Sequence, residues 1–318
     1  MSAPAVNDDH YWLVASRLLA GRVIPFLGAG ANMCGRPAST QWRRGGEFLP
    51  SGAELADYLG SQSRYPPDGA SDLLQVSQYV DAVLGEHVLY EYLRAAFDAN
   101  YTPTALHRLL ADLARMLRER GQPPLLVLTT NYDDALERAF DAAQEPYQAL
   151  WYEAKKGQTC GYFMHRRDDK AVAIRKPNET LLAEHAVILK LHGAIDRSDA
   201  KGDSYVITED NYIDYLTRAD IASRIPVTLR ERLEDSHLLF LGYSLRDWNL
   251  RVIFKRIWGQ RRLDLKSWAV QREQANPRLS EIERQLWRDR GEVEVVYEDL
   301  AAYVTNLRGQ LDEPQLAA

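Results

Sequence analysis

The sequence has few cysteines: Cys34 and Cys160 are the only two among 318 residues. Two isolated cysteines are more typical of free thiols in a reducing compartment than of a disulfide, so the composition favours a cytoplasmic protein. Two thiolates also cannot complete a four-cysteine zinc site. We therefore expect neither bound zinc nor a disulfide framework.

Long apolar runs and an excess of positive charge are also missing. No apolar run approaches the roughly 20 residues that a helix needs to cross a bilayer. Residues 1–10 contain no basic segment followed by an apolar one, which predicts no secretory signal. The formal net charge of -6 is unsuited to a general nucleic-acid or anionic-membrane surface, because both need a basic face. We expect no membrane and no direct nucleic-acid partner.

What the chain does contain is an alternation of short apolar runs with helical patterns. Strands are expected at 23–27, 125–129, 186–191, 205–208, 238–241, 267–270 and 293–297. Helices are expected at 11–19, 133–143, 209–216, 225–234, 250–258 and 279–290. Strands that alternate with helices predict an α/β fold, here a Rossmann-like doubly wound parallel sheet.

The length is compatible with one large domain, 1–318, that carries insertions. The Rossmann-like core is assigned to 11–60, 122–145 and 185–310. The strongly helical stretch 61–121 is predicted to be an inserted smaller helical region. The stretch 146–184, with scattered aromatic residues and a charged run, is predicted to be an irregular insert.

A glycine-rich turn, Gly28-Ala29-Gly30-Ala31-Asn32, follows the first apolar run. Glycines at 28 and 30 would let backbone N–H groups approach a pyrophosphate closely. The third glycine of the dehydrogenase fingerprint is absent, because position 33 is Met, and Glu47 lies in a loop rather than at a strand end. A hydride-transfer dehydrogenase is therefore disfavoured. A tight glycine turn without a ligand remains the alternative.

Two further polar clusters also follow apolar runs. In Thr129-Thr130-Asn131-Tyr132-Asp133, the side chains of Asn131 and Asp133 alternate with Tyr132, so both can face one crevice. The alternative is that one of the two aspartates, Asp133 or Asp134, only caps the following helix. In Leu191-His192-Gly193, the histidine alone would be read as structural. It gains weight because the carboxyl ends of parallel strands converge on one crevice.

A fourth cluster, Gly242-Tyr243-Ser244, also follows a strand. Gly242 permits close approach of a ligand, and Ser244 can donate to a phosphate or ribose oxygen. Asp247, a few residues later, is equally well explained as the cap of the next helix.

Together these clusters resemble the motifs of the sirtuin superfamily, in the same order along the chain. Gly28-Ala29-Gly30-Ala31 is similar to its Gly-Ala-Gly cofactor turn, and Thr130-Asn131-Tyr132-Asp133 to its Thr-Gln-Asn-x-Asp motif with Thr in place of Gln. Leu191-His192-Gly193 resembles the catalytic His-Gly, and Gly242-Tyr243-Ser244 the Gly-Thr-Ser near the adenosine ribose.

The resemblance implies specific roles for these residues. Asn131 and His192 would be catalytic, with His192 as the general base, and Asn131 and Asp133 would line the nicotinamide-ribose pocket. The cofactor-binding residues would be Gly28, Ala29, Gly30, Ala31, Asn32, Asp133, Gly242 and Ser244. The loop 34–52 is placed to close over the bound NAD.

Deacylase sirtuins carry a four-cysteine zinc module between the His strand and the Gly-Thr-Ser turn, and this chain has none. The stretches 205–212 and 242–249 are similar instead to sirtuin-like domains of bacterial anti-phage defence proteins. That branch implies an NAD hydrolase, which takes NAD as its substrate and uses no zinc. It also implies a homo-oligomer, or a separate sensor or ATPase partner that supplies the trigger.

Two other functions stay open at this point. An NAD-dependent protein deacylase would need a channel for an acyl-lysine peptide, and the missing zinc module counts against it. A non-catalytic sensor subunit would bind NAD or ADP-ribose without consuming it. The sequence does not separate that sensor from a hydrolase that is silent until triggered.

Overall fold

The computed structural model describes residues 8–66, 72–155, 160–167, 170–174, 184–217, 221–244, 267–273, 276–291 and 293–313. The helix expected at 250–258 and the proposed cap Asp247 lie outside the described residues. Within the described part of the chain, none of the helices combines the length and hydropathy needed to cross a membrane.

The centre of the molecule is a sheet of nine strands, counted within the described residues, in the order β11-β10-β9-β1-β2-β6-β3-β4-β5. The strands are β1 Val23–Leu27, β2 Leu126–Thr129, β3 Tyr147–Tyr152, β4 Phe163–Arg167, β5 Lys170–Ala173, β6 Ala186–Lys190, β9 His237–Leu241, β10 Ser267–Gln271 and β11 Val293–Tyr297. All neighbouring pairs are parallel except β3 with β4 and β4 with β5. This confirms the predicted α/β, Rossmann-like class.

The strand order reverses at β1. From β1 the chain adds β2 and then β6 on one side, and it later returns to add β9, β10 and β11 on the other. Phe26 of β1 is aligned with Leu128 of β2 and with Phe240 of β9. In open α/β sheets such a switch point opens a crevice at the carboxyl ends of the strands, where ligands bind.

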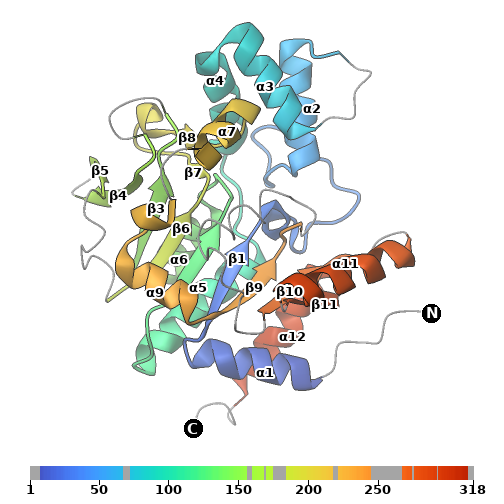
Figure 1. Ribbon diagram of the computed structural model, residues 1–318, viewed down its shortest axis with the longest axis vertical. Helices are drawn as coiled ribbons and strands as arrows, with labels where there is room; N and C mark the ends of the chain where they lie inside the picture. The colour runs from blue at the N-terminus through green and yellow to red at the C-terminus, as the bar shows by residue number, and fades with distance from the viewer. Residues whose placement is uncertain are drawn as a thin grey trace.

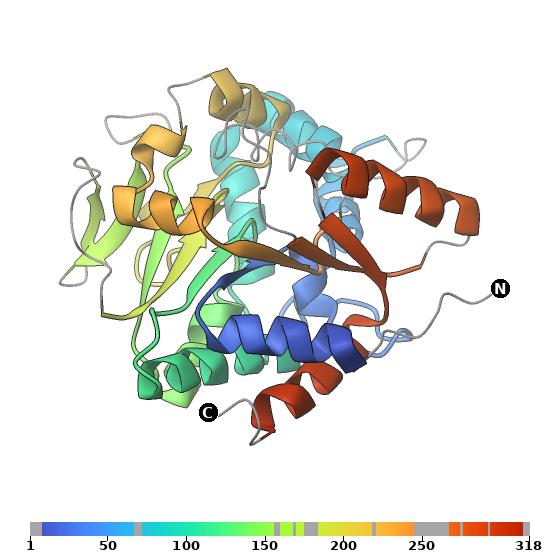
Figure 2. The same ribbon diagram turned by 60° about the horizontal axis from the view of Figure 1, so that its bottom comes forward.

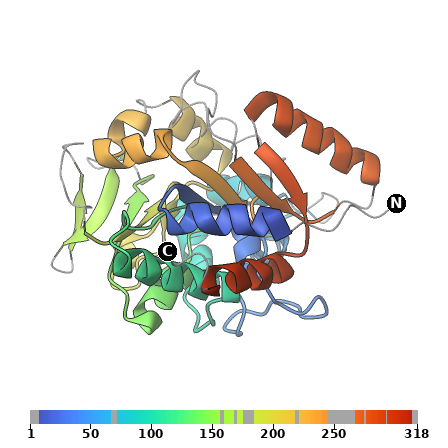
Figure 3. The same ribbon diagram turned by 90° about the horizontal axis from the view of Figure 1, so that it is seen from below.

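Helices cover both faces of the sheet. One face is covered by α1 (Asp8–Leu19), α5 (Ala105–Glu119), α6 (Ala135–Ala143) and α12 (Leu300–Asp312). The other is covered by α7 (Glu209–Thr217), α9 (Val227–Glu234) and α11 (Pro277–Gly291) (Figures 2 and 3). The short helix α8 (Ile221–Arg224) directly precedes Ile225, which packs in the same core. Val23 and Leu27 of β1 pack into the first core and Ile24 and Phe26 into the second, as the alternation of side chains along a strand requires.

Three helices form a separate group above the carboxyl edge of the sheet: α2 (Gly52–Ser63), α3 (Leu73–Leu84) and α4 (Glu86–Phe97) (Figure 1). They share a third core with Tyr205 and Ile207. The apolar face of α5, in contrast, belongs to the core of the sheet. The packed group therefore begins and ends earlier in the chain than the predicted helical insert, 61–121.

Two expectations about strands need correction. The stretch 146–184 is not irregular throughout, because β3 continues the parallel sheet beside β6, and β4 and β5 add an antiparallel edge. Its scattered aromatic residues are of the type that favours strands. The strand expected at 205–208 is only β8 (Ser204–Tyr205), which pairs with β7 (Gly193–Ala194) in a small sheet of its own.

Candidate active site

The predicted motifs meet at the carboxyl ends of β1, β2, β6 and β9. The glycine turn continues β1 as a short 3-10 helix, η1 (Ala29–Met33). The backbone N–H of Thr130, after β2, donates to the carbonyl oxygen of Leu27, and the N–H of Leu191, after β6, donates to that of Thr129. The three strand ends are thus joined by backbone hydrogen bonds beyond the last residues of the strands.

The glycine turn packs directly on the turn that follows β9. A Cβ atom on Gly28 or on Gly30 would lie 2.7 Å from the carbonyl oxygen of Gly242. Gly242 has φ +66° and would meet the backbone of Ala31. Because Cβ atoms essentially never approach so closely, contact between the two turns is by itself sufficient to require glycine at these positions.

Several N–H groups of the turn already have partners inside the protein. Gly28 donates to Leu241, Gly30 to Gly242 and Ala31 to Gly28, at 3.2, 2.8 and 2.9 Å. The sequence hypothesis that the glycines free N–H groups for a pyrophosphate therefore does not apply to these three donors. The close packing of the two turns is the better-supported reason for the glycines, and cofactor binding by the turn stays a prediction.

Asn131 and Asp133 both bond to the glycine turn. The Asn131 amide nitrogen donates to the carbonyl oxygen of Gly28 at 3.1 Å, and the Asn32 amide nitrogen donates to Asp133 Oδ2 at 2.8 Å. All three polar side chains are buried. The structure therefore brings together Gly28, Asn32, Asn131 and Asp133.

Asp133 does cap the following helix, as the alternative interpretation predicts, but the cap uses only one of its two carboxylate oxygens. Asp133 Oδ1 accepts the N–H of Ala135 at 3.0 Å at the start of α6, while Oδ2 holds Asn32. Asp134 instead pairs with Arg197 at 2.8 Å. Tyr132 turns away, as predicted, and its hydroxyl donates to the carbonyl oxygen of Val206.

His192 follows the neighbouring strand β6, and its side chain is buried. Its ring packs edge-on against Tyr212 and Tyr215 of α7, and its Nδ1 lies 3.4 Å from the Tyr212 hydroxyl. Burial lowers the pKa of His192 to about 3, so the ring is neutral at physiological pH. Gly193 has φ +93°, and a Cβ atom there would overlap the Ser204 backbone. The residue after His192 therefore packs directly against the segment that contains Ser204.

Two buried polar atoms at these strand ends have no hydrogen-bond partner among the described residues: His192 Nε2 and Asn32 Oδ1. Buried polar atoms are normally satisfied, so each such atom needs a reason. A polar ligand that enters the crevice would supply the missing partners. The residues present therefore fit a ligand rich in hydroxyl and amide groups.

A pocket of about 280 Å³ lies beside the glycine turn, at the switch point. It is lined by Gly30, Gly242 and Ser244, three of the predicted cofactor residues. Ala29 and Ser244 are exposed, whereas Ala31 is buried. Sequence reasoning missed the rest of the lining, which includes Gln271, Arg272 and Glu298. Gln271 is the last residue of β10, Arg272 follows it and Glu298 follows β11. The convergence of strand ends was therefore the signal that could have found them.

Comparisons with known proteins show the family of this chain. A model of the family described as SIR2-like domain matches residues 125–293, more than half of the chain. The chain belongs to the SIR2-like family. The matched region includes three of the four sirtuin motifs, those with Asn131, His192 and Gly242.

Two curated relatives resemble this SIR2-like chain. It is 27% identical over 230 residues to a protein named NAD(+) hydrolase ThsA from Acinetobacter baumannii (strain 532279), which covers 72% of this chain and 38% of that protein. It is 25% identical over 234 residues to Defense-associated sirtuin 2 from Bacillus subtilis, which covers 73% of this chain and 19% of that protein. The chain thus spans well under half the length of both.

Among the described residues, no group of three or more His, Cys, Asp or Glu side chains is placed to hold a metal ion. Cys34 is buried and Cys160 is partly buried, and neither forms a disulfide. The zinc prediction made from the cysteine count stays a prediction.

Proposed function

We propose that this SIR2-like chain is an NAD+ hydrolase that cleaves the nicotinamide–ribose bond, and that it acts by depleting NAD+ during phage infection. The observation that carries the proposal is the joining of Asn131 and Asp133 to the glycine turn at the sheet's switch point. The names of the two relatives, an NAD(+) hydrolase and a defense-associated sirtuin, support the substrate and the setting.

The chemistry asks for groups that suit a sugar carbon. Water attacks the anomeric carbon as the bond to nicotinamide breaks, through an oxocarbenium-like transition state. An amide has two donors and an acceptor, so Asn131 can hold Gly28 and still bond a ribose hydroxyl or the water. Asp133 would receive the nicotinamide amide. His192 would take the proton that water releases, and ADP-ribose and nicotinamide leave.

The buried state of His192 bears on how fast the reaction can run. A neutral ring can accept a proton, but a pKa of about 3 makes it a weak base. Polar groups of a bound substrate next to Nε2 would raise this pKa toward the useful range. Substrate or water must also displace neighbouring side chains to reach the buried Nε2. Both points favour slow turnover until the site is rearranged.

We further propose that restraint is released by assembly of several copies or by a separate sensor or ATPase partner. An unrestrained NAD+ hydrolase in the cytoplasm would kill its own host. The loop between Cys34 and Gly52 is the candidate cover. It is tied down by Arg36, which forms an ion pair with Glu54 at 2.5 Å and donates to the carbonyl oxygen of Thr40 at 2.7 Å.

The test is to incubate the purified chain with NAD+ and follow nicotinamide and ADP-ribose by chromatography. The protein is used alone at increasing concentration, with acetylated peptide, and with lysate from phage-infected host cells. Equal release of nicotinamide and ADP-ribose, independent of peptide, is the expected result. Release that depends on the acetyl group would favour a deacylase. Binding of ADP-ribose without nicotinamide release in every arm would favour the sensor.

A further inference from the structure

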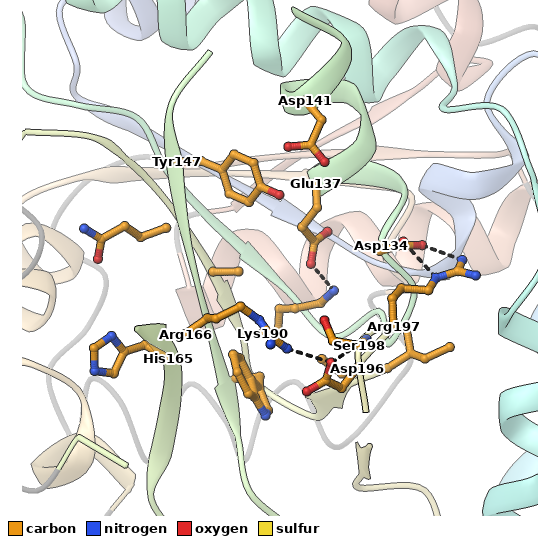
Figure 4. Close-up of a pocket in the computed structure, with 15 residues that line it drawn as sticks. Asp134, Glu137, Asp141, Tyr147, His165, Arg166, Lys190, Asp196, Arg197 and Ser198 are labelled. Carbon is orange, nitrogen blue, oxygen red and sulfur yellow. Dashed lines mark hydrogen bonds and ion pairs between the residues drawn. The ribbon is translucent and has the colours of Figure 1, made fainter. Parts of the chain in front are cut away.

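Lys190 is the last residue of β6, two positions before His192, and its side chain is 1% exposed. It is one of the residues that line a cavity of about 580 Å³, together with residues of α6 and β3. Figure 4 shows the Lys190 ammonium directed toward Glu137 of α6, with Tyr147 of β3 beside Glu137. A lysine this deeply buried needs partners, because an isolated charge is costly to remove from water.

Lys190 has two partners, and they are of different kinds. Its Nζ donates to Glu137 Oε1 at 2.5 Å, which compensates the charge. It also donates to the backbone carbonyl oxygen of Asp133 at 2.5 Å. The second contact crosses from the end of β6, two residues before His192, to the segment that carries Asn131 and Asp133.

We propose that Lys190 is a positioning residue for the active site: its ammonium fixes the Asn131–Asp133 segment through the Asp133 carbonyl, and Glu137 is the ion-pair partner of that ammonium. The inference rests on the proposed function. Asn131 and Asp133 bond to Gly28 and Asn32 through their side chains. Lys190 holds the backbone of the same segment from the opposite side.

Stability alone is a poor reason for this pair. Replacing a buried ion pair by apolar residues of similar volume is often neutral or stabilising, because desolvation offsets the attraction. Here burial raises the pKa of the Glu137 carboxyl even though Lys190 is adjacent, and Glu137 Oε2 has no partner among the described residues. The pair is therefore not an optimised stabilising contact, whereas the bond to Asp133 has a clear geometric effect.

The decisive variant removes both charges at once, Glu137→Met with Lys190→Met. It leaves no unpaired buried charge, so the urea midpoint of unfolding should fall much less than in Lys190→Met alone, where Glu137 loses its partner. The donor to Asp133 is lost, and hydrogen exchange at the amides of Asn131 and Ala135 should become at least about tenfold faster. NAD+ turnover should fall roughly 100-fold, as expected for a misplacement near 1 Å.

The matched control is Arg118→Met with Glu145→Met. It removes another ion pair, 2.9 Å long and with a buried carboxylate, at the opposite end of α5 and α6. Exchange at Asn131 and Ala135 and turnover should both stay within about twofold of the wild type.

Lys190→Arg keeps a donor for the Asp133 carbonyl, and the adjacent cavity has room for the larger group. This variant should restore slow hydrogen exchange at the amides of Asn131 and Ala135. It should also restore NAD+ turnover to within about tenfold of the wild-type rate.

A double methionine variant with wild-type exchange at Asn131 and Ala135 would overturn the proposal. If that variant does not fold, Lys190→Arg decides. A folded Lys190→Arg protein with fast exchange in this segment would equally overturn it. Absence of nicotinamide release from the wild type under every condition would refute the proposed function instead, because the exchange measurement does not depend on turnover.

Discussion

Asn32 donates a hydrogen bond of 2.8 Å to Asp133, across 101 residues of sequence. The bond joins the turn after β1 to the segment after β2, inside the protein. Asp133 uses its other carboxylate oxygen to cap α6 at Ala135. One side chain thus connects the glycine turn to the start of a helix, so the position of that helix and the shape of the crevice depend on each other.

Replacing Asp133 with Ala should destabilise the fold by about 2–4 kcal/mol. The lost cap accounts for about 1 kcal/mol, and the buried Asn32 left without an acceptor costs about 1–3 kcal/mol. Asp133→Asn should cost clearly less, because its amide oxygen can still cap α6 and the Asn32 amide can rotate to accept. Urea unfolding followed by circular dichroism measures both. Equal losses in the two variants would contradict this account.

Asn131→Ala and His192→Ala should each abolish NAD+ cleavage while the protein remains folded. Each removes a buried polar group just after the carboxyl end of a strand, β2 for Asn131 and β6 for His192. Nicotinamide release by the purified variants is the measurement, with His87→Ala as the control, since His87 lies on α4 and its side chain is 84% exposed. Turnover within about tenfold of wild type, a loss below about 1.4 kcal/mol, would remove the residue from the catalytic assignment.

The sequence was sufficient to predict the parallel strands β1, β2, β6, β9, β10 and β11 and the place where the motifs converge, but it missed β3, β4 and β5. Short apolar runs at 23–27, 125–129 and 238–241 have few alternatives to buried parallel strands, and the motifs directly follow them.

Other features depend on contacts that no local pattern contains. That Gly28 and Gly30 pack against Gly242 follows from the pairing of β1 with β9, more than 200 residues apart in sequence. From the sequence, these glycines were attributed to ligand binding. The close packing of the two turns supplies a second reason for them. The sequence alone does not distinguish Lys190 from other charged residues at the ends of strands. Its role depends on the position of α6 against β6.

Gly30→Ala should lower stability by several kcal/mol, because the added Cβ would lie 2.7 Å from the carbonyl oxygen of Gly242 and the two turns cannot separate without cost. Gly309→Ala is the opposite case. Its Cβ would meet nothing within 4 Å on α12, and it should raise stability by about 0.5–1 kcal/mol. Thermal and urea unfolding of both variants test this contrast. A Gly30→Ala protein as stable as wild type would show that the turns are not packed as described.

Removal of divalent metal should leave NAD+ turnover unchanged. The chain has two cysteines, whereas structural zinc sites usually use four protein ligands. The check is elemental analysis of the purified chain, followed by turnover before and after dialysis against a chelator. Stoichiometric zinc, or a loss of activity that added zinc restores, would contradict the prediction.

Acid should destabilise the protein in part through Glu54. Arg36 and the backbone donors around it lower the pKa of Glu54 from 4.5 to about 2. A carboxyl whose pKa is lower in the folded state adds stability above its unfolded value, and this stability is lost as pH falls from about 5 to 2. Allowing for solvent screening of a side chain that is 28% exposed, the contribution is about 1–2 kcal/mol.

Glu54→Gln should therefore show a shallower loss of stability than wild type between pH 5 and 3 in urea unfolding. Glu91→Gln, which removes an exposed carboxylate of α4, should keep the wild-type slope. Parallel curves for wild type and Glu54→Gln would show that Arg36 and Glu54 do not hold the loop between Cys34 and Gly52 in the way the structure indicates.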